Sequence, residues 1–418
     1  MSTVVCRLPY GHGDLTVEVP EADLLDVVTA AAEEAGADEA GLITSALQQP
    51  IGSPRLEELV EPGQTICVVT SDLTRPCPSD RILPHILAEL DRAGVGERDV
   101  VIVMALGLHR PMTDEELVTA VGREVWERYR VINHDPDDVV QLGTTGAGTP
   151  VEVFRAVVEA DFRVCLGNLE FHYFAGFSGG AKAIVPGCAS RATVNANHAM
   201  MVRPEATAGR IDGNPVRLDL EEATGMVGGH FMLNVLVDSS HRICEAVAGD
   251  LTAAHRRGCE MVEARGAVSI PARADIVLVS SGGHPSDLNM YQAQKALDNA
   301  VHAVRVGGVI IWVAECGERF GNSTFETWLT EAESPGQVLE RIQADFVLGG
   351  HKAAAMAAVM QQASVYLVSG LEDEVVSACG LRPFAGVDEA LWAARAEVGE
   401  GATILSLPNG GSVMPSPA

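Results

Sequence analysis

The sequence predicts an α/β fold with two domains, each built on a mainly parallel sheet. Short apolar runs rich in β-branched residues alternate with longer amphipathic segments, which is typical of strands joined by crossover helices. The chain has 418 residues, more than one hydrophobic core usually serves. Gly266 and Pro271 interrupt the pattern within residues 266–273, and a new series of strands and helices begins after them.

The individual elements follow from these runs in chain order. The short apolar runs predict strands at residues 66–70, 100–106, 162–166, 276–280, 309–314, 365–368 and 403–407. Helical periodicity with few breakers predicts helices at residues 80–93, 113–121, 291–304, 352–362 and 387–398.

The break in the pattern also sets the expected domain boundaries. We expect a first domain over residues 1–268 and a second over residues 269–400, which is an ordinary domain size. Residues 401–418, with the last strand and its Pro-Asn-Gly-Gly turn, are expected to return to the first domain.

The composition is that of a folded, acidic protein. Hydrophobic residues make up 47% of the chain and charged residues 21%, and 57 Asp and Glu against 29 Lys and Arg give a formal net charge of −28. This charge would repel a phosphate backbone, so we expect no nucleic-acid partner. A small anionic substrate would need local positive charge, which draws attention to Arg75, Lys182 and Lys295.

The cysteines and the chain's apolar stretches indicate where the protein resides. The nine cysteines occur singly, without the paired spacing of a metal site, and are expected to be reduced thiols. The first residues contain no basic segment followed by an apolar region, and no stretch approaches the ~18 uncharged apolar residues that cross a bilayer. We therefore expect a cytoplasmic protein that does not bind membranes.

A glycine-rich loop at residues 171–182 is the most informative motif. It carries an imidazole at His172 and an amine at Lys182, and His198 follows sixteen positions later. Backbone N–H groups in such a loop can converge on a phosphate, and a lysine at its end can act as a charge partner or as a nucleophile. The loop is not a Walker loop, because Ala183 stands where a hydroxyl residue would be needed.

Three candidate segments follow three expected strands. Asp72 to Arg75 follow the strand at 66–70, His109 follows the strand at 100–106, and His172 follows the strand at 162–166. Ligands of α/β folds bind at the carboxyl ends of parallel strands, so we expect one shared site. Residues 276–295 repeat the arrangement in the second domain, which predicts an active-site cleft between the domains.

These motifs resemble those of the lactate racemase family. The family motif is matched by His172, by residues 176–182 with the sequence GFSGGAK, by Pro186-Gly187 and by His198. Three further segments match in order and rough spacing, namely residues 72–76 (DLTRP), 107–110 (GLHR) and 291–295 (YQAQK). The resemblance extends from the opening residues 8–11 to the C-terminal residues 409–411.

The resemblance implies a cofactor and a role for each site residue. Members of the family carry a nickel-pincer nucleotide, pyridinium-3,5-bisthiocarboxylic acid mononucleotide with Ni²⁺, covalently attached to a lysine, here Lys182. It makes His198 the protein ligand to nickel, which is chemically reasonable for an imidazole. The implied acid–base residues are His109 and His172, since imidazole can exchange protons near neutral pH. The remaining implied contacts are Asp72, Gly176, Ser178, Gly179 and Gly180 to the cofactor, and Arg75, Tyr291, Gln292 and Lys295 to the substrate.

Position alone leaves simpler interpretations open for these residues. His198 alone would more often be a surface or capping residue, and His109 and His172 could each be structural. Lys182 could be a solvated lysine, and Asp72 could orient Arg75 or a cofactor hydroxyl, or cap the helix near Ser79. Gln292 and Lys295 could lie at a solvated helix start.

The leading functional hypothesis is a racemase or epimerase of a 2-hydroxy acid such as lactate, acting by hydride transfer to the tethered cofactor. The α C–H bond is a very poor acid, so removal of a hydride is easier than removal of a proton. Proteins that make the cofactor are the implied partners, beside the small 2-hydroxy acid. The alternatives are a 2-hydroxy acid dehydrogenase using NAD, whose glycine motif has no convincing match here, and a non-catalytic carrier of the nickel nucleotide.

Overall fold

The computed structural model describes residues 2–29, 38–238 and 240–417. Contacts divide the chain into two compact units, Glu33–Ala264, here called the middle unit, and Met1–Ala32 with Arg265–Ala418, here called the terminal unit. Each unit contains a six-stranded sheet, and parallel pairs predominate in both. The predicted α/β class with mainly parallel sheets is therefore confirmed.

The sheet of the middle unit has the strand order β13-β12-β9-β4-β5-β6, with β12 and β13 antiparallel and the other neighbours parallel. Its strands are β4 (Ile66–Ser71), β5 (Val100–Ala105), β6 (Arg130–Asn133), β9 (Phe162–Asn168), β12 (His230–Val237) and β13 (Ile243–Gly249). The central strands are buried along nearly their whole length, as apolar runs in a covered parallel sheet should be.

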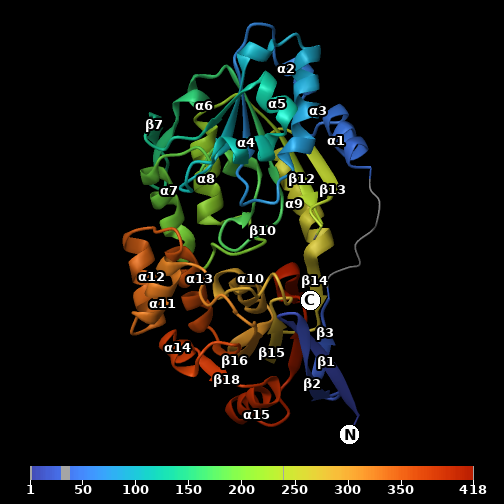
Figure 1. The fold of residues 1–418 in the computed structure, drawn as a ribbon, viewed down its shortest axis with the longest axis vertical. Helices are drawn as coiled ribbons and strands as arrows, with labels where there is room; N and C mark the ends of the chain where they lie inside the picture. The colour runs from blue at the N-terminus through green and yellow to red at the C-terminus, as the bar shows by residue number, and fades with distance from the viewer. Residues whose placement is uncertain (1, 30–37, 239, 418) are drawn as a thin grey trace. The chain divides into compact units, whose positions relative to one another are not determined.

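Helices pack against this sheet, and their buried side chains form a hydrophobic core with those of the strands. A buried apolar cluster joins one face of the sheet to α1 (Glu39–Gln48), α2 (Leu56–Leu59), α3 (Ser79–Arg92), α4 (Asp114–Val121) and α5 (Arg123–Arg128). Figure 1 shows these helices in blue and cyan beside the sheet. The unit also contains β7 (Val139–Thr144), β8 (Pro150–Phe154), α6 (Arg155–Glu159), the short hairpin β10 (Phe171–His172) and β11 (Gly176–Phe177), α7 (Arg191–His198), α8 (Pro215–Gly225) and α9 (Ala253–Gly266).

The sheet of the terminal unit has the order β18-β17-β16-β15-β19-β3, and all its neighbouring strands are parallel. Its strands are β3 (Leu24–Val27), β15 (Ala274–Ser280), β16 (Val304–Val313), β17 (Ser364–Val368), β18 (Arg382–Phe384) and β19 (Ile404–Leu407). A buried cluster joins one face to the hairpin of β1 (Thr3–Tyr10) and β2 (Gly13–Pro20) and to α15 (Val387–Val398). The other elements are β14 (Ala267–Ile270), α10 (Met290–Ala300), α11 (Ser323–Thr330), α12 (Pro335–Ala344), α13 (Gly350–Met360), α14 (Asp373–Ala378) and β20 (Met414–Pro417).

Both chain ends belong to the terminal unit, which differs from the expected domains of residues 1–268 with 401–418 and of 269–400. β19 lies between β15 and β3, and the Thr403 N–H and hydroxyl donate to Asp275 Oδ2 over 2.8 and 2.7 Å. The expected return of residues 401–418 to the first domain is therefore replaced by pairing within the second sheet. Local pattern cannot reveal this, because the pairing joins segments from opposite ends of the chain. The cleft between the domains stays a prediction.

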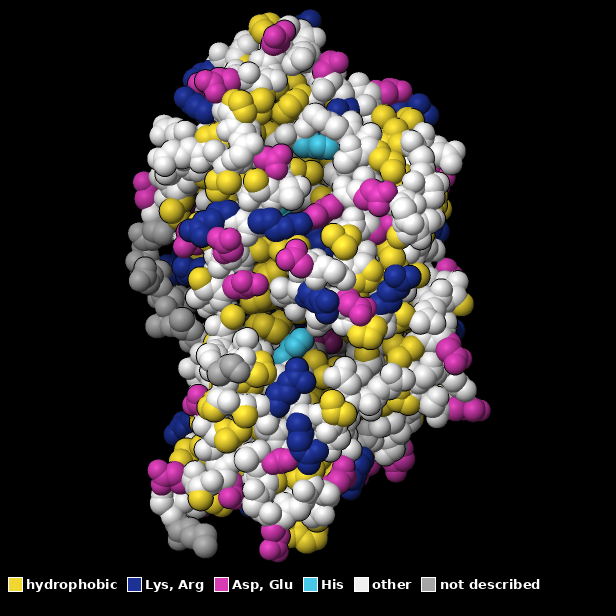
Figure 2. Space-filling model, turned by 180° about the vertical axis from the view of Figure 1, so that it is seen from behind, with side chains coloured by type: hydrophobic (Ala, Val, Ile, Leu, Met, Phe, Trp, Pro, Cys, Tyr) yellow, Lys and Arg dark blue, Asp and Glu magenta, His cyan; other side chains and the backbone are white. Residues whose placement is uncertain are grey.

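The surface carries both signs of charge despite the net charge of −28. Figure 2 shows Lys and Arg side chains interspersed with Asp and Glu over one face. Exposed pairs such as Arg128 with Glu97 and Arg155 with Asp138 have N···O distances of 2.6 and 2.9 Å. Such pairs contribute only about 0–1 kcal/mol each. In the described part of the chain, no helix is long and apolar enough to cross a membrane.

Replacing a core residue of β19 tests the position of this strand. Leu405→Ala should lower the free energy of unfolding by about 2–5 kcal/mol, because Leu405 is fully buried and the change leaves a cavity. Hydrogen exchange followed by mass spectrometry should become faster in β15 and β3 and stay unchanged in β4 and β9. Val306→Ala is the control and should change stability by less than about 0.5 kcal/mol, since Val306 is 71% exposed. Faster exchange in β4 or β9 with β15 unaffected would contradict the observed pairing.

Candidate functional site

The three segments predicted to share a site follow neighbouring strands of the middle unit. β4 is parallel to both β5 and β9, so the loops after these strands leave the same edge of the sheet. Asp72 follows β4, His109 follows β5, and His172 follows β9. The loop after β5 also contacts the segment after Lys182, because the Gly107 N–H donates to the Gly187 carbonyl over 2.9 Å.

Asp72 and His109 form a close pair within this group. The His109 Nδ1 lies 2.5 Å from Asp72 Oδ2, while Asp72 Oδ1 accepts hydrogen bonds from the N–H and hydroxyl of Thr74 over 3.0 and 2.6 Å. Burial raises the pKa of Asp72, but the bonds from His109 and Thr74 outweigh it and hold this pKa below its ordinary value. The ionised carboxylate then accepts the Nδ1 proton and leaves the Nε2 lone pair as the base of His109. Asp72 thus orients His109, a partner that the sequence did not indicate.

The ring of Phe174 gathers three of the predicted residues around it. Its centroid lies 4.5 Å from that of His172, 4.9 Å from that of His198, and 5.6 Å from Lys182 Nζ. His172 belongs to β10, which pairs with β11, and its Nδ1 accepts the Ala175 N–H over 3.3 Å. This bond places the proton of the neutral His172 ring on Nε2.

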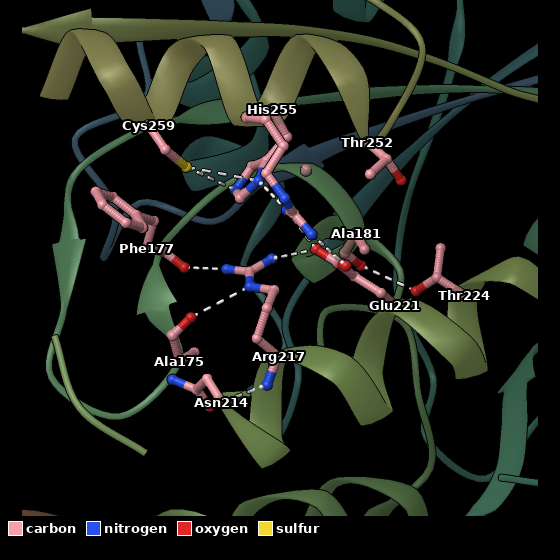
Figure 3. Close-up of polar contacts among 12 residues, drawn as sticks. Ala175, Phe177, Ala181, Asn214, Arg217, Glu221, Thr224, Thr252, His255 and Cys259 are labelled. Carbon is pink, nitrogen blue, oxygen red and sulfur yellow. Dashed lines mark hydrogen bonds and ion pairs between the residues drawn. The ribbon is translucent and has the colours of Figure 1, made fainter. Parts of the chain in front are cut away.

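Side chains from α8 and α9 hold the glycine-rich loop by its carbonyl groups (Figure 3). The buried guanidinium of Arg217 on α8 donates from Nε to the Ala175 carbonyl over 3.2 Å and from Nη2 to the Phe177 carbonyl. His255 on α9 donates from Nε2 to the Ser178 carbonyl over 2.9 Å. Thr224 donates to the Ala181 carbonyl over 3.2 Å, just before Lys182. The loop backbone is therefore fixed from within the middle unit.

The glycines of the loop allow this close packing. A Cβ on Gly176 would lie 2.1 Å from the Arg210 carbonyl oxygen, and Gly176 has a φ of +75°. A Cβ on Gly179 would lie 2.5 Å from Asn234 Oδ1, and one on Gly180 would lie 2.6 Å from His255 Cδ2. Any larger residue would push the loop away from β12 and α9. Ser178 also holds the loop close to the sheet, because its hydroxyl donates to the carbonyl of Asn168 at the end of β9 over 2.8 Å.

The backbone N–H groups of the loop differ from the expected phosphate cradle. The Phe177 N–H donates to the Ala175 carbonyl and the Ser178 N–H to the Glu170 carbonyl, both over 2.9 Å. The Gly180 N–H donates to Asn234 Oδ1 over 2.7 Å. These N–H groups stabilise the loop itself, and the loop residues therefore have a structural role. Direct cofactor contacts stay a prediction for Gly176, Ser178, Gly179 and Gly180.

His198 is the last residue of α7 and is buried, which differs from the simpler interpretation of a surface residue. The helix starts after Ser190, whose hydroxyl accepts the Thr193 N–H over 3.1 Å as an N-cap. Across the residues that the structure describes, no cluster of three or more His, Cys, Asp or Glu side chains could hold a metal ion.

The predicted substrate residues of the second domain lie on α10 of the terminal unit. Tyr291, Gln292 and Lys295 are within its first two turns, and Asn289 caps the helix by accepting the Gln292 N–H over 3.0 Å. The Lys352 Nζ donates to the Tyr291 carbonyl over 2.6 Å and lies 4.4 Å from the Tyr291 ring centroid. Substrate binding by these three residues, and by Arg75 of the middle unit, stays a prediction.

Comparison with known proteins decides the family. A family model described as the lactate racemase N-terminal domain matches residues 10–209, and one described as the lactate racemase C-terminal domain matches residues 270–415. The lactate racemase of Thermoanaerobacterium thermosaccharolyticum is 34% identical over 420 residues, covering 98% of this chain and 98% of its own. The lactate racemase of Lactiplantibacillus plantarum is 31% identical over 420 residues, covering 97% of this chain and 98% of its own. The chain belongs to the lactate racemase family.

Solved structures agree with this assignment. The lactate racemase apoprotein from T. thermosaccharolyticum superimposes with a TM-score of 0.88 at 33% identity, covering 99% of this chain and all of the other. A Thermotoga maritima protein with a TM-score of 0.61 and 20% identity, covering 88% of this chain and 100% of its own, shares the fold. As a member of the lactate racemase family the protein is an isomerase, so the dehydrogenase and carrier alternatives are not retained.

The electrostatics of the loop suit a family member that uses a lysine amine. Burial lowers the pKa of Lys182 well below its ordinary value, and the nearby positive charges of Arg75 and Arg217 lower it further, against a smaller opposing effect of Glu170. Burial likewise lowers the pKa of His172, with Lys182 and Arg75 adding to the effect. Both shifts favour the neutral form of the group, in which the amine is nucleophilic and the imidazole is basic.

Sequence reasoning missed two residues that structure brings to these motifs. Arg217 carries no local signal, because a buried arginine within an amphipathic helix looks like a surface one. Lys352 did have a signal. The chain contains only three lysines, Lys182, Lys295 and Lys352, among its 29 basic residues, and the first two lie in family motifs.

Substitution of Arg217 tests the support of the loop. Arg217→Met should lower the free energy of unfolding by about 1–3 kcal/mol and speed hydrogen exchange across residues 174–181, because two buried carbonyl groups lose their donor. Arg257→Met is the matched control on α9, since this exposed arginine pairs only locally with Glu260, and it should leave both measurements unchanged. Equal exchange of the loop in the two variants would show that Arg217 does not hold it.

The lowered pKa of Lys182 predicts the pH at which its amine reacts. An amine acylates only when neutral, so Lys182 should become reactive at a pH below its ordinary value of 10.5. Arg75→Gln should move this midpoint to higher pH, because it removes a nearby positive charge, whereas Arg110→Gln on the neighbouring loop should not. Peptide mass spectrometry after acylation of the apoprotein at several pH values reads the lysines separately. A Lys182 midpoint at or above 10.5 would contradict the electrostatic account.

Proposed function

We propose that the protein inverts the α-carbon of lactate or a related 2-hydroxycarboxylate, using a nickel-pincer nucleotide tethered to Lys182. The observation that carries this proposal is the gathering of His172, Lys182 and His198 around the Phe174 ring in a chain of the lactate racemase family. Curated relatives over nearly the full chain are named lactate racemase, which makes lactate the first substrate to test.

The residues present suit the proposed cofactor. Covalent attachment needs an amine that is neutral, and burial with Arg75 and Arg217 lowers the pKa of Lys182 accordingly. An imidazole is an ordinary nickel ligand, and His198 would hold the metal. When bound, the cofactor would supply an acceptor for the α hydrogen as a hydride, which the protein side chains lack.

The two histidines supply the proton chemistry at the substrate hydroxyl. His109, with its Nδ1 proton on Asp72, takes the hydroxyl proton at Nε2 as the C–O bond becomes a carbonyl. His172 presents Nε2–H, because its Nδ1 accepts the Ala175 N–H, so its neutral ring can hydrogen-bond the oxygen of the opposite enantiomer, and it delivers a proton to that oxygen when the ring has first taken up a second proton from solvent. Loss of the α hydrogen gives a planar 2-keto acid, and its return to the other face completes the inversion.

Binding of the substrate carboxylate is assigned to cationic and polar groups. Arg75 can hold a carboxylate with two parallel hydrogen bonds, which a lysine cannot do in the same geometry. Tyr291, Gln292 and Lys295 of α10 would complete the binding. The proposal also implies cofactor-making proteins as partners, a cytoplasmic location and no nucleic-acid partner.

Isotope labelling of the substrate tests the proposed reaction directly. The protein is produced together with cofactor-making proteins, and intact mass and metal analysis should show an adduct on Lys182 and one nickel. Lactate deuterated at Cα should then racemise with a primary isotope effect and keep its label in the inverted product. Racemisation by a preparation without adduct and nickel, or rapid entry of solvent deuterium at Cα, would overturn the proposal.

Substitution of the histidines tests the acid–base assignment. His109→Ala and His172→Ala should each lower turnover by about 10²–10⁴-fold, the usual contribution of a positioned acid or base. The adduct on Lys182 should remain in both, which separates loss of chemistry from loss of the cofactor. His12→Ala, a histidine outside the site motifs, serves as control. Unchanged turnover in the His109 and His172 variants would remove these residues from the mechanism.

A further inference from the structure

A buried hydrogen-bond network begins at His198 and leads away from the loop. The His198 Nδ1 lies 3.0 Å from the amide oxygen Oδ1 of Asn197, the preceding residue of α7. His198 is 8% exposed and Asn197 is fully buried. The proton on this bond decides which ring nitrogen of His198 keeps a lone pair.

The surroundings of Asn197 fix the orientation of its amide. The Asn197 Nδ2 donates to the Val216 carbonyl over 3.1 Å and to Asp219 Oδ2 over 2.8 Å. A backbone carbonyl can only accept, so the amide nitrogen must face Val216 and the amide oxygen must face His198. An amide oxygen also only accepts. The His198 Nδ1 therefore carries the proton, and the lone pair of the neutral ring is on Nε2.

Asp219 is itself held in place by two hydroxyl groups. Thr145 donates to Asp219 Oδ1 and Thr149 donates to Asp219 Oδ2 over 2.8 Å. Both threonines lie near the turn between β7 and β8, and the Thr149 N–H donates to the Thr145 hydroxyl over 3.1 Å. All three side chains are at most 5% exposed.

Such a network is expensive to bury unless every member is satisfied, and here it includes one imidazole nitrogen. If the network served only to join α7 to α8, the hydrogen bonds from Asn197 Nδ2 to Val216 and Asp219 would suffice. The position of the proton on the His198 ring would then be irrelevant. Metal-ligating histidines commonly donate their second ring N–H to an acceptor that fixes tautomer and ring orientation. The geometry at Asn197 has this form.

We propose that Asn197 and Asp219 are positioning residues that hold His198 with its proton on Nδ1 and its lone pair on Nε2, ready to ligate nickel. This inference rests on the proposed function for the metal, while the tautomer follows from the hydrogen bonds alone. Asn197 acts directly on His198, and Asp219, with Thr145 and Thr149 behind it, acts through Asn197.

The tautomer is measured first, in the apoprotein. Two-bond ¹H–¹⁵N correlation spectra of protein labelled in histidine distinguish the two neutral tautomers, and His198→Gln assigns the resonance by removing it. The unchanged protein should show His198 with the proton on Nδ1. Asn197→Leu, similar in volume but without the acceptor, should give a mixture of tautomers. A His198 protonated on Nε2 in the unchanged protein would overturn the inference, and this result does not depend on whether any variant folds.

Nickel retention is measured next, in protein produced with its cofactor. Asn197→Leu and Asp219→Asn should weaken retention against a chelator by about 10–100-fold, the usual effect of losing such support, with the Lys182 adduct unchanged. Glu222→Gln is the matched control, an acid-to-amide change one turn along α8 at a residue that accepts the Gly146 N–H over 2.8 Å. It should retain nickel as the unchanged protein does.

The outcomes separate the inference from the proposed function. Nickel retention and a tautomer unchanged in both Asn197→Leu and Asp219→Asn would overturn the positioning role. Nickel retained as tightly by His198→Ala would instead overturn the ligand assignment within the proposed function. In that case the tautomer spectra still judge whether Asn197 sets the state of His198.

Discussion

The glycine-rich loop depends on a positive charge buried behind it. Arg217 is fully buried, its Nη1 lies 3.7 Å from the Glu221 carboxylate, and its Nε and Nη2 donate to the carbonyl groups of Ala175 and Phe177. Burial lowers the pKa of Arg217 to about 10 although Glu221 raises it, so the guanidinium stays charged at neutral pH. A buried charge is costly, and it is tolerated here because the loop's own carbonyl dipoles solvate it. The same bonds fix the backbone from which His172 and Lys182 project.

This arrangement concentrates positive charge in an otherwise acidic protein. Arg75, Arg217 and His198 all act on His172, and Arg75 and Arg217 both act on Lys182. Burial lowers the pKa of the amine and of the imidazole, and the guanidinium charges lower both further because like charges disfavour protonation. The site therefore combines an attraction for anions with neutral nucleophilic and basic groups. A lysine on the acidic surface would have neither property, because solvent and nearby carboxylates would keep it protonated.

Sequence reasoning predicted the parts that local pattern and family motifs carry. The strands β4, β5 and β9 are apolar runs with functional residues directly after them, so the position of Asp72, His109 and His172 at one sheet edge followed from topology. Two features could not be predicted, namely the pairing of β19 with β3 and the hydrogen bonds from Arg217 to the glycine-rich loop. Each joins segments distant in sequence through contacts that have no local sequence pattern. The bond between Asp72 and His109 has the same origin, since 37 positions separate the two residues.

Lysine and arginine have different roles in this chain, and the difference helps to explain why lysine stands at positions 182 and 352. Arginine supplies the cation in exposed ion pairs such as Arg110 with Glu116, where only charge and a fork of donors are needed. An amine has three properties that a guanidinium lacks, namely a compact head, a pKa that burial can lower, and nucleophilicity. A lysine is therefore suited to positions where one of these properties is needed. Lys182 has the lowered pKa, and Lys352 places its compact ammonium against both the carbonyl and the ring of Tyr291. The few lysines of this chain thus include one with a lowered pKa and one whose ammonium holds the first turn of α10.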